Sequence, residues 1–142
     1  MSITRDTRPP DPVQQAQRAK LDDLARALRH THSALLEAVK LDFEKLNGKV
    51  GGPFQLFQLV TNEPFFQWLR PLSGLMASLD ELIDEKRLLT ESEIGEVRSS
   101  ITGLFDARDV SGFGANFQSR IMDSALIAGH RDDVLQKLEA LT

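Results

Sequence analysis

The stretch PVQQAQRAKLDDLARALRHTHSALLEAVKLDFEKL, residues 12–46, decides the fold class of this chain. Its apolar residues recur at steps of three and four positions, which is the spacing of one face of an α-helix. The residues of this face are Leu21, Leu24, Leu28, Leu35, Val39, Phe43 and Leu46. Asp11 followed by Pro12 is typical of a helix start, and Asn47-Gly48 is typical of a helix end. The sequence therefore predicts one long helix over residues 12–46.

The length of this helix sets a condition on the whole molecule. Residues 12–46 would span about 52 Å at 1.5 Å per residue. A compact sphere of this chain length would have a diameter under about 40 Å. We therefore expect one of three arrangements: an elongated bundle, a broken helix, or a helix end that packs on a second subunit.

The remaining sequence predicts further helices separated by clear stop signals. Residues 53–87 form a helical rod with joints near Pro64 and Pro71, because proline disfavours the α region for the residue before it, here Arg70. Thr90 to Glu93 reads as a capping box that starts a helix. Residues 109–114 form a loop. Residues 115–141 form a last helical region, with Gly129-His130 as the candidate break.

No segment shows the alternating pattern of a β-strand. The sequence therefore predicts an all-α fold, an antiparallel helical bundle of four main helices, the second one broken by prolines. Residues 1–10 are expected to form a disordered tail, and residues 11–142 a single helical-bundle domain.

Composition excludes several classes of function. The chain has no cysteine, which excludes a disulfide framework, a thiol nucleophile and thiolate zinc sites. Its net charge is −4, and residues 80–109 carry nine acidic and four basic residues, so we expect no nucleic-acid partner. No apolar run approaches the roughly 20 residues that span a bilayer, and residues 1–10 lack the apolar core of a secretory signal. We expect no membrane association and a cytoplasmic location.

The sequence offers few candidates for chemistry. His32 lies within the apolar face of the first helix, and we favour a hydrogen-bonded core histidine over a metal ligand. His30 points elsewhere, and no Glu-x-x-His pair of a di-iron bundle is present. Residues 112–114 read G-x-G but lack the preceding strand and the third glycine of a nucleotide-binding loop. We expect no cofactor, no metal and no catalytic residue, and we lean against an enzyme.

Aromatic residues concentrate in one short segment. Five of the nine in the chain fall within residues 54–68. Of these, Phe57 and Trp68 suit the core-facing side, whereas Phe54 and Phe66 do not fit the same helix orientation. Either a second helix covers Phe54 and Phe66, or they form an exposed apolar patch that marks a partner or ligand surface.

Small residues also recur at helical spacing. Gly95, Ser99 and Gly103 are spaced by four, as are Gly74 and Ser78. Glycine inside a helix costs about 1 kcal/mol relative to alanine. Close approach of another helix, from the same chain or from a second one, would compensate for this cost.

The segment NEPFFQWLRPLSGLMASLDELI, Asn62–Ile83, carries a resemblance. Together with the flanking sequence from His32 to about His130, it is similar to a small family of uncharacterised bacterial proteins. In that family an acidic or polar residue, proline, two aromatic residues, Trp-Leu-Arg-Pro-Leu and a helix follow one another in this order. The resemblance implies an all-α fold. It implies no activity, cofactor or functional residue.

These observations lead to two expectations about function. The first is a non-catalytic helical interaction domain that self-associates as a homodimer and can also bind another protein. The alternative is a bundle that binds a small apolar ligand in a pocket between the first helix and residues 54–72. The residues of interest are Phe54 and Phe66 as the exposed surface, with His32 and Arg70 as polar anchors of the pocket.

Overall fold

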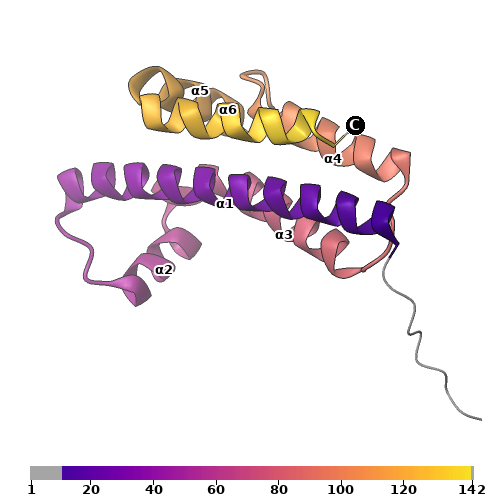
Figure 1. Ribbon diagram of the computed structural model, residues 1–142. Coiled ribbons are helices and arrows are strands. Elements are labelled where there is room, and N and C mark those ends of the chain that lie inside the picture. Colours follow the sequence, from indigo (N-terminus) through magenta and orange to yellow (C-terminus); the bar gives the residue numbers. More distant parts are fainter. Residues whose placement is uncertain (1–10, 142) are drawn as a thin grey trace, which may run out of the picture.

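The computed structural model describes residues 11–141, so the predicted disordered tail, residues 1–10, lies outside the described residues. The described part of the chain contains six α-helices and one 3-10 helix, and no strand (Figure 1). The elements are α1 (Pro12–Asn47), α2 (Pro53–Asn62), η1 (Pro64–Leu69), α3 (Arg70–Asp84), α4 (Glu91–Phe105), α5 (Phe113–Asp123) and α6 (Ala125–Glu139). The all-α prediction is confirmed. The finer prediction of four main helices is not, because two of the expected rods are each divided into shorter helices.

Helix α1 forms as the sequence predicts. The Asp11 carboxylate accepts a hydrogen bond from the backbone N–H of Val13 at 2.9 Å, which caps the first turn. The helix ends at Asn47, and the following Gly48 adopts φ +84°, a conformation that favours glycine. Because α1 is unbroken, the alternative of a broken helix, one of the three arrangements considered, is excluded. Its C-terminal end extends past α5 and α6, so the molecule is elongated (Figure 1).

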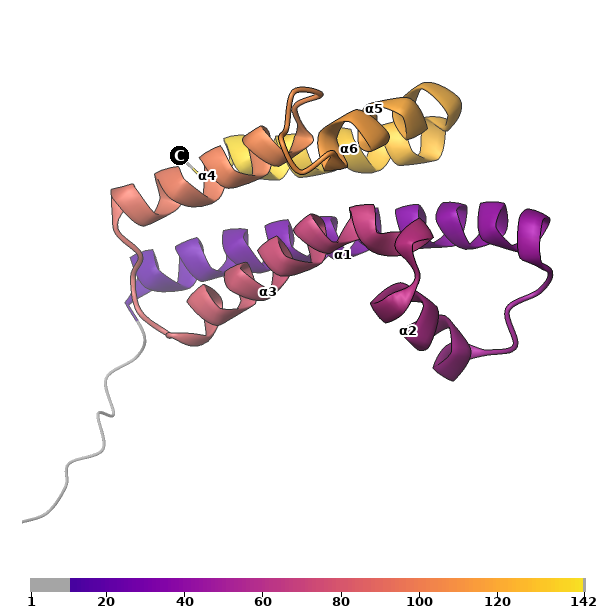
Figure 2. The same ribbon diagram turned by 180° about the vertical axis from the view of Figure 1, so that it is seen from behind.

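Helix α1 packs on α6, on α3 and on η1. Helix α4 connects the two sides of the bundle, because it packs on α3 and on α5 (Figures 1 and 2). The Arg18 side chain near the start of α1 reaches the backbone carbonyl of Ile83 near the end of α3, so the two helices run antiparallel. At the other end, Arg120 of α5 forms an ion pair with Asp42 of α1 at 2.5 Å.

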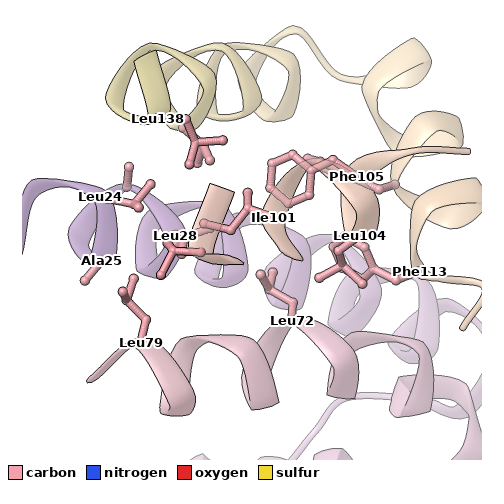
Figure 3. Close-up of a cluster of buried hydrophobic side chains, with 14 of the residues drawn as sticks. Leu24, Ala25, Leu28, Leu72, Leu79, Ile101, Leu104, Phe105, Phe113 and Leu138 are labelled. Carbon is pink, nitrogen blue, oxygen red and sulfur yellow. The ribbon is translucent and has the colours of Figure 1, made fainter. Parts of the chain in front are cut away.

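The core fills the space where these helices meet. Figure 3 shows Leu24 and Leu28 of α1 facing Leu72 of α3, Ile101 of α4 and Leu138 of α6. All five side chains are buried. One apolar stripe on each amphipathic helix is therefore covered by its neighbours, as expected for a helical domain.

The two prolines of the predicted rod act differently. Glu63, directly before Pro64, has φ −85° and ψ 124°, so the chain leaves the helical region there. Arg70, directly before Pro71, has φ −56° and ψ −42° and stays in the α region, so that part of the prediction is wrong. Pro71 falls in the first turn of α3, where a missing N–H costs no helix bond. The joint at Pro71 is therefore a change from 3-10 to α geometry.

The start of α4 confirms the predicted capping box. The backbone N–H of Glu93 donates to Thr90 Oγ1 at 3.1 Å, and the backbone N–H of Thr90 donates to Glu93 Oε1 at 3.0 Å. The Arg87 guanidinium donates to both oxygens of Glu93, at 2.8 and 2.6 Å. This bidentate bond lowers the pKa of Glu93 to about 2.

The last helical region breaks at Ser124, five residues before Gly129, so the position of the expected break is wrong. Helix α5 ends at Asp123, and α6 begins after Ser124, whose Oγ accepts from the backbone N–H of Ile127 at 3.2 Å. The reason is that a serine N-cap starts a new helix there, whereas a glycine within a helix costs only about 1 kcal/mol.

Candidate functional site

Helix α2 is the least buried element of the described chain. Its ten residues, PFQLFQLVTN, include five large apolar side chains and no charged one, yet none of the ten is buried. Phe54 is 76% exposed and Phe57 is 67% exposed. Leu56, Leu59 and Val60, on the other side of the helix, are half-buried against the rest of the molecule. We call residues 48–62 the α2 arm.

The α2 arm is attached to the molecule mainly at its C-terminal end. Figures 1 and 2 show α2 projecting below the C-terminal half of α1, and its main packing contact is η1. The Arg70 guanidinium donates a hydrogen bond to the backbone carbonyl of Thr61. On the other side, the link from α1 contains Gly48 and Gly52, with φ +84° and +144°. Two glycines in such conformations allow the sharp change of direction between α1 and α2.

Phe66 lies in the core, and its predicted place on an exposed surface is wrong. Its side chain is 0% exposed, and its ring centroid lies 5.4 Å from that of Phe43 and 6.0 Å from that of Phe65. Phe57, expected in the core, is exposed instead. Both errors have one cause: the chain restarts at Pro64 in a 3-10 helix, so η1 presents its side chains in a different rotational phase from α2.

His32 is half-buried and has a structural partner. Its Nε2 is hydrogen-bonded to Ser73 Oγ at 3.0 Å, and burial lowers the pKa of its imidazole. The ring of His30 instead lies beside that of His130, with centroids 6.2 Å apart. Within residues 11–141, no three His, Asp or Glu side chains are grouped so that they could hold a metal ion.

The region expected to form a ligand pocket, between α1 and residues 54–72, contains packed aromatic rings. Phe43, Phe65 and Phe66 contact one another there at centroid distances of 5.4 to 6.0 Å. Arg70, expected as a polar anchor beside His32, is exposed and bonded to α2. Each of the two anchors therefore has its own partner within the protein.

A groove lies elsewhere, between α3 and α4, and its cavity volume is about 350 Å³. Five apolar side chains line it: Leu75, Leu79, Leu82, Val97 and Ile101. Four polar residues also line it: Ser78, Glu93, Glu96 and Ser100. The sequence suggested this feature only indirectly, through the small residues of these two helices.

The small-residue pattern does not mark close packing within the chain. A Cβ atom placed on Gly74, Gly95 or Gly103 would have no neighbour within 4 Å. The close approach occurs instead at Gly114, where a Cβ atom would lie 1.7 Å from the carbonyl oxygen of Asp106. Gly114 packs the start of α5 against the end of α4, and the glycines of α3 and α4 border open space.

Comparisons with protein-family models, with curated proteins and with solved structures found no match to this chain. The resemblance of Asn62–Ile83 to a bacterial family therefore stays a prediction, and the function has to be argued from the site. Among the described residues, no helix is both long enough and apolar enough to cross a membrane.

Proposed function

We propose that this protein is a non-catalytic helical interaction domain that self-associates, and that the α2 arm carries the contact. The observation that supports this most strongly is an uncharged ten-residue helix whose two phenylalanines are 76% and 67% exposed. Single exposed apolar residues, such as Met122 at the end of α5, are normal on protein surfaces. Two adjacent aromatic side chains on a helix without any buried residue are typical of a contact surface.

The exposed apolar area of Phe54 and Phe57 is large enough to support a contact. With about 200 Å² for one phenylalanine, the exposed parts of Phe54 and Phe57 amount to roughly 280 Å². Covering this area would contribute about 7 kcal/mol at 25 cal/mol per Å². Association and ordering cost several kcal/mol of this gain. The arm is therefore sufficient for a dimer of moderate affinity when it is used twice.

A second copy of the chain is the partner that the charges favour. The chain carries a net charge of −4, so two copies repel each other through their net charge. Residues 50–62 contain no charged side chain and offer a surface without such repulsion. Leu41 and Leu46, near the end of α1, are 50% and 75% exposed and extend the apolar character of this end.

The alternative function, binding of a small apolar ligand between α1 and residues 54–72, has less support. Phe43, Phe65 and Phe66 already fill that space. The polar anchors expected there, His32 and Arg70, are hydrogen-bonded to Ser73 and Thr61.

Light scattering at micromolar concentration tests the proposal. We expect a mass of about 32 kDa, twice the 15.9 kDa of one chain. The double variant Phe54→Asp/Phe57→Asp should give the mass of one chain, with its far-UV circular dichroism unchanged. Met122→Asp is the matched control, because Met122 is also exposed, at 87%, but lies on another helix. A wild-type mass of 15.9 kDa contradicts the proposal, and so does a Met122→Asp control that also has the mass of one chain.

A further inference from the structure

We propose that the α2 arm of one copy occupies the groove between α3 and α4 of a second copy, and that the two copies exchange arms reciprocally. This inference rests on the proposed self-association and names the surface that receives the arm. Among the described residues, α2 is an apolar helix without any buried residue, and the groove between α3 and α4 has an apolar lining. The helix and the groove fit in size and in chemistry.

The size of the groove matches the two exposed rings. An apolar cavity of about 150 Å³ holds one benzene molecule, so two aromatic rings need about 300 Å³. The groove offers about 350 Å³. Phe54 and Phe57 are three positions apart in α2, so their side chains project from the same face one turn apart. Both rings can therefore enter the groove together.

The chemistry of the two surfaces also matches. Leu75, Leu82 and Val97 provide an apolar lining for the rings. At the rim, Glu96 and Ser100 offer oxygen acceptors. Helix α2 brings no carboxylate that would repel Glu96, and its Gln55 and Gln58 are exposed amide donors that flank the phenylalanines. A neutral, amide-bearing aromatic helix thus suits a groove with an apolar lining and an acidic rim.

The groove of another copy receives the arm, because the arm is held away from its own groove. Within one chain, Arg70 ties Thr61 to the start of α3. The groove lies along residues 75–82 of α3 and 93–101 of α4. Figures 1 and 2 show α2 at one end of the molecule and the connection from α3 to α4 at the other end. The arm therefore presents its rings outward, to a neighbouring molecule.

Reciprocal exchange closes the assembly at two copies. An arm inserted in one direction only would leave a free arm and a free groove, and such contacts build chains without end. Two exchanged arms cover roughly 280 Å² each, on the order of 560 Å² for the four phenylalanine rings together. A standard interface buries about 1,200–2,000 Å², so the rings account for less than half of one.

Two substitutions of adjacent serines test the groove by mass. Ser100→Arg places a long side chain at the rim of the groove, and Ser99→Arg places the same side chain one position away, outside the groove lining. Both residues are exposed, so both variants should fold, which circular dichroism verifies. We expect Ser100→Arg to weaken dimerisation at least tenfold and Ser99→Arg to leave it unchanged.

Cysteine pairing then identifies which surfaces meet, and the chain has no native cysteine to interfere. A Gln58→Cys chain is mixed with a Ser100→Cys chain, and as a control with a Ser99→Cys chain, under mild oxidation. We expect the mixed Gln58→Cys/Ser100→Cys disulfide to form at least tenfold faster than the control pair. Disulfides require Cα atoms within about 7 Å, so the reaction reports direct proximity.

The outcomes separate this inference from the proposed function. A dimer that survives Ser100→Arg but not Phe54→Asp/Phe57→Asp overturns the exchange and leaves self-association through α2 in place. Faster pairing of two Gln58→Cys chains with each other has the same meaning, because α2 would then meet α2. A monomeric wild-type protein overturns both proposals.

Discussion

Truncation of Phe66 to alanine should be among the most damaging single changes in the core. The side chain is 0% exposed, and the rings of Phe43 on α1 and Phe65 on η1 surround it at 5.4 and 6.0 Å. Buried Phe→Ala substitutions cost about 3–5 kcal/mol, and the cost is largest where neighbours cannot move into the cavity. We expect the upper part of this range, because two stiff rings on two different elements line the site.

The expected cost of Phe66→Ala is large relative to the whole free energy of unfolding. The free energy of unfolding of a domain is about 5–15 kcal/mol, so Phe66→Ala should remove about a quarter of it or more. For a chain of this length, about 4 kcal/mol corresponds to a decrease in Tm of roughly 13 °C. Phe54→Ala is the matched control, with the same chemical change at a side chain that is 76% exposed. We expect this control to change the free energy of unfolding by less than about 0.5 kcal/mol.

Urea unfolding followed by circular dichroism measures both variants, at a concentration low enough that the wild-type protein is monomeric. The dilution is needed because loss of a dimer contact would also lower the apparent stability of Phe54→Ala. Equal free-energy losses in the two variants would refute the assignment of Phe66 to the core and Phe54 to the surface. A loss below about 1.5 kcal/mol for Phe66→Ala would show that the site collapses more easily than its three rings indicate.

Two further predictions concern single positions. Gly114→Ala should lower the free energy of unfolding by more than about 2 kcal/mol, because the added Cβ would lie 1.7 Å from the Asp106 carbonyl oxygen. Gly103→Ala should raise the free energy of unfolding by about 0.5–1 kcal/mol, because its added Cβ would have no neighbour within 4 Å. Urea unfolding measures both variants. Burial lowers the pKa of His32 in the folded state, so as the pH decreases the imidazole is protonated in the unfolded chain before it is protonated in the folded one. Stability should therefore fall as the pH decreases from about 6.5 towards the lowered pKa, and His32→Gln should reduce this slope in unfolding curves measured across that range.

Much of the fold follows from signals that are local in sequence. The spacing of Leu21, Leu24 and Leu28 reports which side of α1 is buried, and all three are buried in the structure. Thr90 and Glu93 cap α4 through their own side chains, so their role is visible within four residues. Features of this kind need no knowledge of the partner helix, which is why they are predicted correctly.

The errors arise where the rotational phase of the chain changes. The sequence predicts a joint near Pro64, but the assignment of Phe57 and Phe66 uses one helix orientation for both sides of that joint. The 3-10 turn that begins at Pro64 rotates the side chains that follow it, so Phe66 lies in the core, whereas Phe57, before the turn, is exposed. The spacing of the apolar residues does not reveal this change of rotational phase, because apolar residues occur both before and after Pro64.

The sequence predicts one part of the candidate site, the exposed aromatic residue, but not the groove. An excess of aromatic residues in 54–68 indicated that some of them would lack a host, and Phe54 does lack one. The groove between α3 and α4 could not be predicted, because its volume depends on how far apart two helices pack. Gly74, Gly95 and Gly103 pointed to these helices, but as positions of close packing, whereas they border open space.

The short length of α2 links its folding to its contact. Isolated helices below about 12–15 residues are marginal in water, and α2 has ten. Within one chain it is supported by η1 and by the half-buried Leu56, Leu59 and Val60, so it is the helix with the least support from the core. A contact that covers Phe54 and Phe57 would therefore stabilise the helix as well as the dimer. Part of the gain from covering the two rings is spent on ordering the arm, which favours a dimer of moderate affinity over a permanent one.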